Sequence, residues 1–269
     1  MEEAIKQFLA EDVGAGDITT DSIVPADHRS EASILAKEEC ILAGHSFARK
    51  VFAALDPDVA YEEIIKDGSA ADKGATVSRV KARTRAILTG ERVALNIFQR
   101  LSGIATATRG FVRVVEGTKV KILDTRKTSP GMRAMEKYAV RMGGGQNHRF
   151  GLYDMALVKE NHIAIAGSIR EAVARIRKCS TIAVEVEVRN MNELQQAIEA
   201  GVDRIMLDNW KDADIREAVS RIGGSIPIEV SGNMTVGRAQ EIARRGIDFI
   251  SVGSITHSFK SVDLSLLIL

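Results

Sequence analysis

The chain has few of the residues that mark several functional classes. Its 269 residues include only two cysteines, Cys40 and Cys179, and neither lies in a CxxC or histidine-paired spacing. We therefore expect two reduced, buried thiols in a cytoplasmic protein, and no disulfide or zinc framework. Aromatic residues make up 4% of the chain. That is too few to predict a stacking surface for single-stranded nucleic acid.

An excess of charge of one sign is also missing. Lysine plus arginine number 37 and aspartate plus glutamate 36, a formal net charge of +1, which argues against a domain-wide field for nucleic acid. No run of about 18 apolar residues predicts a membrane span. The acidic start MEEAIKQFLAEDVGAGD lacks the cationic and apolar regions of a signal peptide. An anion site in this chain must therefore be built from local charge.

The first hundred residues differ in rhythm from the rest. Strand-like and helix-like stretches are mixed there, with strands expected over 31–44 and 75–88 and helices over 46–57 and 89–108. The last of these is amphipathic, with Val93, Ile97 and Leu101 on its apolar face. This mixture predicts an N-terminal α+β sandwich domain over residues 1–103. We expect the C-terminal tail, residues 259–269, to pack back on it.

From residue 120 short apolar runs alternate with helix-like stretches. The runs cover 121–126, 155–161, 181–188, 203–209, 226–232 and 248–254. Gly201, Gly223 and Gly246 stand where helix C-caps belong. This rhythm predicts parallel βαβ units over residues 104–258 and favours an α/β barrel. An open doubly wound sheet is the alternative, but it would place ligands only near its switch point.

Reactive or small residues stand at the end of each run. In chain order they are Arg126 and Lys127; Lys159, Asn161 and His162; Glu187; Asp208 and Asn209; Ser231 and Gly232; and Gly253 and Ser254. In an α/β barrel the C-terminal strand ends form the active-site face. We therefore expect these side chains to meet in one mouth.

The cations of the stretch 123–163 divide into two groups. Four of them end an apolar run or follow the triple glycine 143–145 in a loop, namely Arg126, Lys127, His148 and Arg149. Cations gathered at a strand-end mouth suit a carboxylate or phosphate site. The other three lie at i, i+4 and i+8 and predict an exposed helix stripe, namely Arg133, Lys137 and Arg141.

Two carboxylates and two turns complete the candidate site. Glu187 and Asp208 offer the hard oxygen ligands that Mg²⁺ prefers, although they could instead pair with neighbouring cations. Glu185 alternates with Glu187, and we choose Glu187 because it lies nearer the strand end. The turns 231–233 and 252–254 offer N–H donors for phosphate, with His257 close behind. No GxSxG elbow or nucleophile–base pair predicts covalent acyl transfer.

Several motifs together resemble the quinolinate phosphoribosyltransferase family, also called nicotinate-nucleotide pyrophosphorylase (carboxylating). They include EDVGAGDITTDSIVP, ERVALNIFQRLSGIATAT, LDTRKTSPGMRAMEKYAVRMGGGQNHRFGLYDMALVKENHI, VEVEV, IMLDN, IEVSGN and ISVGSITHS. The resemblance implies an N-terminal sandwich followed by an incomplete, TIM-like α/β barrel of about seven strands. It also implies phosphoribosyl transfer from phosphoribosyl pyrophosphate to quinolinate with decarboxylation, in de novo NAD biosynthesis. Such enzymes form homodimers, or larger assemblies of dimers, in which the partner's N-terminal domain covers each barrel mouth.

The resemblance assigns roles to matching positions. It implies that quinolinate carboxylates are bound by Arg126, His148, Arg149 and Lys159, with Arg92 reaching in from the other subunit. It implies that phosphoribosyl pyrophosphate and Mg²⁺ are handled by the catalytic residues Lys127, Glu187 and Asp208, with Thr125 beside them. It implies that phosphate is held by Ser231, Gly232 and Asn233, and by Gly253, Ser254 and Ile255 with His257. The family usually has SGG where this chain has SGN, and we expect Asn233 to tolerate the left-handed conformation of that turn.

Two other functions remain open. A related phosphoribosyltransferase with another acceptor, such as the molybdenum-transport-associated paralogue, would alter the acceptor cations, and retention of His148, Arg149 and Lys159 argues against it. A non-catalytic binder of an anionic metabolite would not need carboxylates beside a phosphate site. Turnover of quinolinate separates the three.

Overall fold

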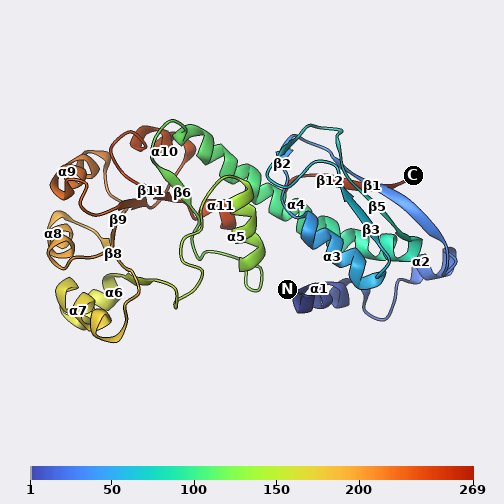
Figure 1. The fold of residues 1–269 in the computed structure, drawn as a ribbon, viewed down its shortest axis with the longest axis horizontal. Helices are drawn as coiled ribbons and strands as arrows, with labels where there is room; N and C mark the ends of the chain where they lie inside the picture. Colours follow the sequence, from blue (N-terminus) through green and yellow to red (C-terminus); the bar gives the residue numbers. More distant parts are fainter. Residues whose placement is uncertain (1) are drawn as a thin grey trace. The chain divides into compact units, whose positions relative to one another are not determined.

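The computed structural model describes residues 2–269, which form two compact units. The first unit comprises the chain up to Arg109 together with Ser129–Gly144 and Phe259–Leu269, and the second comprises Gly110–Thr128 and Gly145–Ser258. The expected boundary near residue 103 lies inside one long helix, α4 (Thr84–Val115), which contributes to both units (Figure 1).

The first unit is built on a four-stranded antiparallel sheet of order β12-β1-β5-β3. Its strands are β1 (Arg29–Ala36), β3 (Ala60–Glu63), β5 (Thr76–Arg83) and β12 (Leu264–Ile268), and β2 (Cys40–Ile41) pairs separately with β4 (Ala70–Ala71). The helices are α1 (Glu2–Val13), α2 (Ile18–Ile23), α3 (His45–Leu55), α5 (Arg133–Met142) and the first part of α4. The strand expected over 75–88 ends at Arg83, because α4 begins at Thr84.

The C-terminal segment pairs with the first strand. β12 runs antiparallel to β1 with Ala36 opposite Leu264 and Ala32 opposite Ile268. Leu264 and Leu266 are buried at this pairing, so the end of the chain completes the core of the first unit.

The second unit confirms the expected parallel βαβ pattern. Its sheet has the order β6-β11-β10-β9-β8-β7. The strands are β6 (Lys121–Leu123), β7 (Ala156–Val158), β8 (Val184–Val188), β9 (Arg204–Asp208), β10 (Ile228–Ser231) and β11 (Phe249–Ser251). The helices are α6 (Glu160–Ala166), α7 (Ile169–Cys179), α8 (Met191–Glu199), α9 (Asp212–Ile222), α10 (Val236–Ile242) and α11 (Ser254–His257). Helices α7 to α10 lie on the outer side of the sheet (Figure 1).

In place of a seventh strand, the described chain has a single parallel bridge between Leu123 and Gln146. Gln146 donates its backbone N–H to Ile122 and accepts from Asp124. The ladder stops there because His148 N and Asn147 Nδ2 bind the Asp124 carboxylate, at 2.8 and 2.7 Å. The buried Asp124 side chain therefore takes the backbone N–H of His148, which a longer strand would use for pairing, and also binds the side-chain amide of Asn147.

Valine and glutamate alternate along β8, and this alternation determines which face of the sheet carries the acidic side chains. Val184, Val186 and Val188 are fully buried on one face, and Glu185 and Glu187 lie on the other. Strands of parallel sheets are covered on both faces, so the acidic face looks into the interior of the unit. Glu187 indeed lines the interior cavity described below.

Some local expectations are corrected. Lys137 is only 1% exposed, so it does not belong to the solvated helix stripe expected for Arg133, Lys137 and Arg141, whereas Arg141 is exposed as expected. Cys40 is buried as expected, but Cys179 is exposed at the end of α7. Gly201, Gly223 and Gly246 all have positive φ, yet only Gly223 is itself a C-cap residue. Within residues 2–269 no helix combines the length and apolar composition needed to cross a membrane.

Candidate active site

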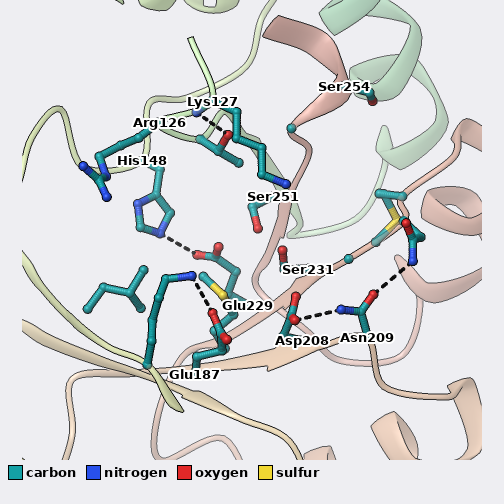
Figure 2. A pocket seen from close by; sticks show the side chains of 18 of the residues that line it. Arg126, Lys127, His148, Glu187, Asp208, Asn209, Glu229, Ser231, Ser251 and Ser254 are labelled. Atoms are coloured by element: carbon teal, nitrogen blue, oxygen red, sulfur yellow. Dashed lines mark hydrogen bonds and ion pairs between the residues drawn. The ribbon is translucent and has the colours of Figure 1, made fainter. Parts of the chain in front are cut away.

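A cavity of about 840 Å³ lies at the carboxyl ends of the strands of the second unit (Figure 2). Of the site residues that the family resemblance predicts in this unit, all except Ile255 line it, namely Thr125, Arg126, Lys127, His148, Arg149, Lys159, Glu187, Asp208, Ser231, Gly232, Asn233, Gly253, Ser254 and His257. Asn161 and His162, which follow β7 and were expected in the same mouth, do not line it, and His162 Nδ1 instead accepts the backbone N–H of Lys159. Ile255 is 1% exposed and lies in the core. Arg92 belongs to the first unit, where it is exposed on α4. The strand-end pattern therefore brings fourteen separate positions to one place.

Like charges gather at one side of the cavity. Arg126 follows the end of β6, and Arg149 follows the loop that leaves the Gln146 bridge. Burial and the nearby charge of Arg126 both lower the pKa of Arg149. The Arg149 guanidinium is held by a hydrogen bond from Nη1 to Met155 O at 3.0 Å. A bound carboxylate would relieve the repulsion between the two guanidinium groups.

Lys159 and Glu187 pair across neighbouring strands. Lys159 follows β7, and its Nζ lies 2.8 Å from Glu187 Oε2 on β8. This matches the ion-pair alternative raised for Glu187. A carboxylate ligand that competes for the half-exposed Lys159 would free Glu187 for another partner.

The turns after β9 and β10 are tied together by asparagines. Asn209 Nδ2 donates to Asp208 Oδ2 at 2.7 Å, and Asn233 Nδ2 donates to Asn209 Oδ1 at 3.2 Å (Figure 2). Asn233 has φ 46°, which confirms that asparagine adopts the left-handed conformation at this turn. Gly232 has φ 95°, and a Cβ there would collide with Asn209, so the close approach of the two turns requires glycine.

A short helix places Lys127 on the phosphate side of the cavity. Thr256 Oγ1 of α11 donates to Lys127 O at 2.8 Å, and Lys127 N donates to Thr125 Oγ1 at 3.0 Å. A Cβ on Gly253 would lie 3.1 Å from both Lys127 Cδ and His257 Nε2. Gly253 therefore lets these two side chains lie against the turn.

The sequence reasoning missed two residues beneath His148. His148 Nε2 lies 3.0 Å from Glu185 Oε2 and 3.4 Å from Glu229 Oε2, and both glutamates are 0% exposed. Arg204 Nη1 lies 3.1 Å from Glu229 Oε2. Glu185 was set aside in favour of Glu187, and Glu229 was not singled out. Their signal was a glutamate inside an apolar, β-branched run, in VEVEV and IEV.

Burial and proximity shift the pKa values of this trio. Burial disfavours the charged His148 ring, but its hydrogen bonds to Glu185 and Glu229 outweigh burial and raise the pKa of His148 to about 9. Burial, together with the charge of Glu229, raises the pKa of Glu185 to about 7. For Glu229 burial is outweighed by the hydrogen bond to His148, so its pKa is lowered. The three side chains thus shift one another's pKa values in the interior of the unit.

The fold and the cavity define a class of protein. Parallel strand ends surround a cavity lined by cations, carboxylates and glycine turns, in which Lys159 pairs with Glu187. Such an arrangement suits small polyanionic molecules that carry phosphate.

Comparison with known proteins gives the family. The quinolinate phosphoribosyl transferase N-terminal domain matches residues 17–102, and the C-terminal domain matches residues 104–267. A probable nicotinate-nucleotide pyrophosphorylase [carboxylating] of Bacillus subtilis is 43% identical over 99% of this chain and 92% of its own length. The chain belongs to the quinolinate phosphoribosyltransferase family.

Solved structures agree in fold over the whole chain. The nicotinate-nucleotide pyrophosphorylase from Francisella tularensis is 45% identical, with a TM-score of 0.95 over 100% of this chain and 95% of the other. NadC from Streptococcus pyogenes is 41% identical, with a TM-score of 0.95 over 100% of this chain and 96% of the other. The similarity therefore extends over both units.

Proposed function

We propose that this protein transfers the phosphoribosyl group of phosphoribosyl pyrophosphate to quinolinate, yielding nicotinate mononucleotide, pyrophosphate and CO₂ in de novo NAD biosynthesis. One observation carries the proposal, namely the division of charge in the 840 Å³ cavity. The guanidinium groups of Arg126 and Arg149 line one part of it, and Asp208 with the glycine turns lines another, while Lys159 and Glu187 form an ion pair. The names of the relatives support this reaction, since they describe quinolinate phosphoribosyltransferases or carboxylating nicotinate-nucleotide pyrophosphorylases.

The cationic side suits quinolinate. This substrate is a planar dianion, and the guanidinium forks of Arg126 and Arg149 match carboxylates in a bidentate way. Lys159 adds a third cation from the end of β7. These groups orient the pyridine nitrogen toward the ribose, and a cation near the ring carbon that loses the carboxylate would stabilise the electron pair left on that carbon as CO₂ departs.

The opposite side suits phosphoribosyl pyrophosphate. The turns at Ser231–Asn233 and Gly253–Ser254 offer backbone N–H groups for phosphate, and Lys127 lies between them and the cations. When pyrophosphate leaves, positive charge builds at the anomeric carbon. The protein must then position the two substrates and stabilise the leaving group, which explains a site without a nucleophile–base pair.

Two carboxylates fit a magnesium ion bound together with the substrate. Glu187 and Asp208 line the same cavity from neighbouring strands and offer only hard oxygen donors. They would hold Mg²⁺ along with pyrophosphate oxygens and water, and the bound ion would neutralise charge on the leaving group. The buried trio of His148, Glu185 and Glu229 does not support this assignment, because Arg204 already pairs with Glu229.

Assembly belongs to the same proposal. We propose a homodimer, or a larger assembly of dimers, in which Arg92 of one subunit completes the site of its partner. The exposed position of Arg92 on α4 is compatible with this role.

The test is turnover with defined substrates. Purified protein is incubated with quinolinate, phosphoribosyl pyrophosphate and Mg²⁺, and both nicotinate mononucleotide and pyrophosphate are measured. Nicotinate in place of quinolinate is the control acceptor. Absence of product, or turnover of another acid with quinolinate inert, rejects the proposed acceptor, and binding without turnover would indicate a non-catalytic protein.

A further inference from the structure

Two carboxylates lie under a site that we assign to a dianion. Glu185 on β8 and Glu229 on β10 are both 0% exposed, and both face the ring of His148. Figure 2 shows the contact between Glu229 and His148. Buried like charges cost stability, and replacing buried ion pairs with apolar residues is often neutral or stabilising. Packing alone therefore gives no reason for two glutamates here.

Both ring nitrogens and the backbone N–H of His148 have contacts. Nε2 faces Glu185 Oε2 at 3.0 Å and Glu229 Oε2 at 3.4 Å. Nδ1 accepts the backbone N–H of Arg149 at 2.8 Å, and His148 N donates to Asp124 Oδ1 at 2.8 Å. A ring that accepts this hydrogen bond at Nδ1 carries its proton on Nε2, facing the two carboxylates, and a charged ring keeps that Nε2 proton and gains a second one on Nδ1.

Each of the two buried glutamates has a cation beside it. Arg204 on β9 lies behind Glu229, and its guanidinium also stacks 4.1 Å from the centroid of Phe249. Glu229 thus has Arg204 as a permanent cation, whereas Glu185 faces His148. On the cavity side the ring is followed directly by Arg149, whose guanidinium lies near that of Arg126.

We propose that Glu185 and Glu229 are positioning residues for the quinolinate-binding cations. They hold the Nε2 proton of His148 in the interior, and this orients Nδ1 together with the Arg149 backbone that binds it. Their effect on substrate passes through His148 and Arg149. The inference rests on the proposed function for its substrate, but the position and ionisation of His148 can be measured without turnover.

Glu185→Gln is the decisive variant. The amide has the same shape, and it removes the repulsion between the two carboxylates, so the variant should fold with a melting temperature equal to or above that of the wild type. Its KM for quinolinate should rise by about 10-fold, by analogy with residues that orient metal-binding histidines, and its KM for phosphoribosyl pyrophosphate should change little. Glu217→Gln, an exposed glutamate on α9, is the matched control.

A double substitution tests whether Glu185 acts through His148. If it does, Glu185→Gln should cost little more in a His148→Gln background, because coupled residues are not additive. Fully additive losses overturn the proposal, and so does an unchanged KM for quinolinate in a folded Glu185→Gln protein.

Ring titration gives a readout that a purely structural role would not move. The neighbouring carboxylates of Glu185 and Glu229 raise the pKa of His148 to about 9, whereas an ordinary histidine titrates near pH 6.5. Nitrogen-15 NMR of the five histidines, assigned with His148→Gln, should show the His148 midpoint falling in Glu185→Gln. A midpoint that does not move overturns the proposal even if the wild type turns over quinolinate. A wild type that is inactive, with the midpoint shift observed, rejects the proposed function alone.

Discussion

Arg126 and Arg149 illustrate how single residues set the chemistry of this protein. Two guanidinium groups share one cavity, and burial together with the charge of Arg126 lowers the pKa of Arg149. Such a pair is unfavourable by itself and favourable around a dianion, because each fork gains a carboxylate and the repulsion is screened. If the two side chains bind quinolinate as proposed, their repulsion would favour a dianion over a monoanion.

Removing the guanidinium group of Arg126 should therefore strongly weaken binding of the transition state. Arg126→Ala should lower kcat/KM for quinolinate by an amount equivalent to roughly 2–5 kcal/mol, as for desolvated charge pairs. Arg126→Lys keeps the charge without the planar fork and should lie between wild type and Arg126→Ala. Steady-state kinetics with each substrate varied in turn provides the measurement. A near-normal kcat/KM in Arg126→Ala would remove this residue from the site.

The sequence pattern alone was enough to find the site residues that follow the ends of the strands. Arg126, Lys159 and Asp208 stand where an apolar run stops, and strand ends of parallel sheets meet at one edge. Glu229 could not be found in the same way, because it lies within an apolar run and its partner His148 is distant in the chain. Lys137 was misread for a related reason, since an i, i+4, i+8 spacing of cations describes a helix face and not what covers that face.

At the scale of elements, the strands were predictable from the sequence, and the contacts that hold the turns around the cavity were not. The strands of the second unit agree with the predicted runs to within a few residues, and their βαβ order followed from the short connections. The single bridge at Gln146 was not predictable, because it depends on side-chain competition from Asp124. The turns after β9 and β10 also depend on a distant group: Arg238 of α10 donates to Gly232 O and to Trp210 O, each at 2.7 Å.

The two hydrogen bonds of Arg238 should contribute both to the stability of the fold and to phosphate binding at the turns. Arg238→Ala removes two charge-assisted hydrogen bonds, which we expect to lower the free energy of unfolding by about 2–4 kcal/mol. The KM for phosphoribosyl pyrophosphate should rise several-fold, while the KM for quinolinate stays close to wild type. Urea unfolding and steady-state kinetics measure the two effects, and Arg244→Ala, an exposed arginine just after α10, is the control. If the KM values for phosphoribosyl pyrophosphate and quinolinate change equally, Arg238 does not act specifically on the turns proposed to bind phosphate.

At the scale of the whole molecule, the chain places its candidate residues in two units. The second unit holds fourteen of the predicted positions around one cavity, and the first holds Arg92 on the exposed side of α4. Sequence periodicity predicted both kinds of unit, because a mixed antiparallel pattern and a βαβ rhythm differ in period. It could not say which copy of the chain supplies Arg92, because periodicity carries no information about neighbouring subunits.

Subunit mixing decides whether Arg92 acts across a dimer. In a shared-site dimer, one protomer with Arg92→Ala and one with Arg126→Ala form one site with both arginines and one site with neither. Random reassociation of the two inactive variants should then restore about one quarter of wild-type activity, because half of the dimers are mixed and each has one intact site. Mixing Arg126→Ala with Arg149→Ala should restore nothing, since both substitutions lie in the same unit and neither mixed site is intact. If size-exclusion chromatography and mass spectrometry show mixed dimers and the first pair stays inactive, Arg92 serves its own subunit or none.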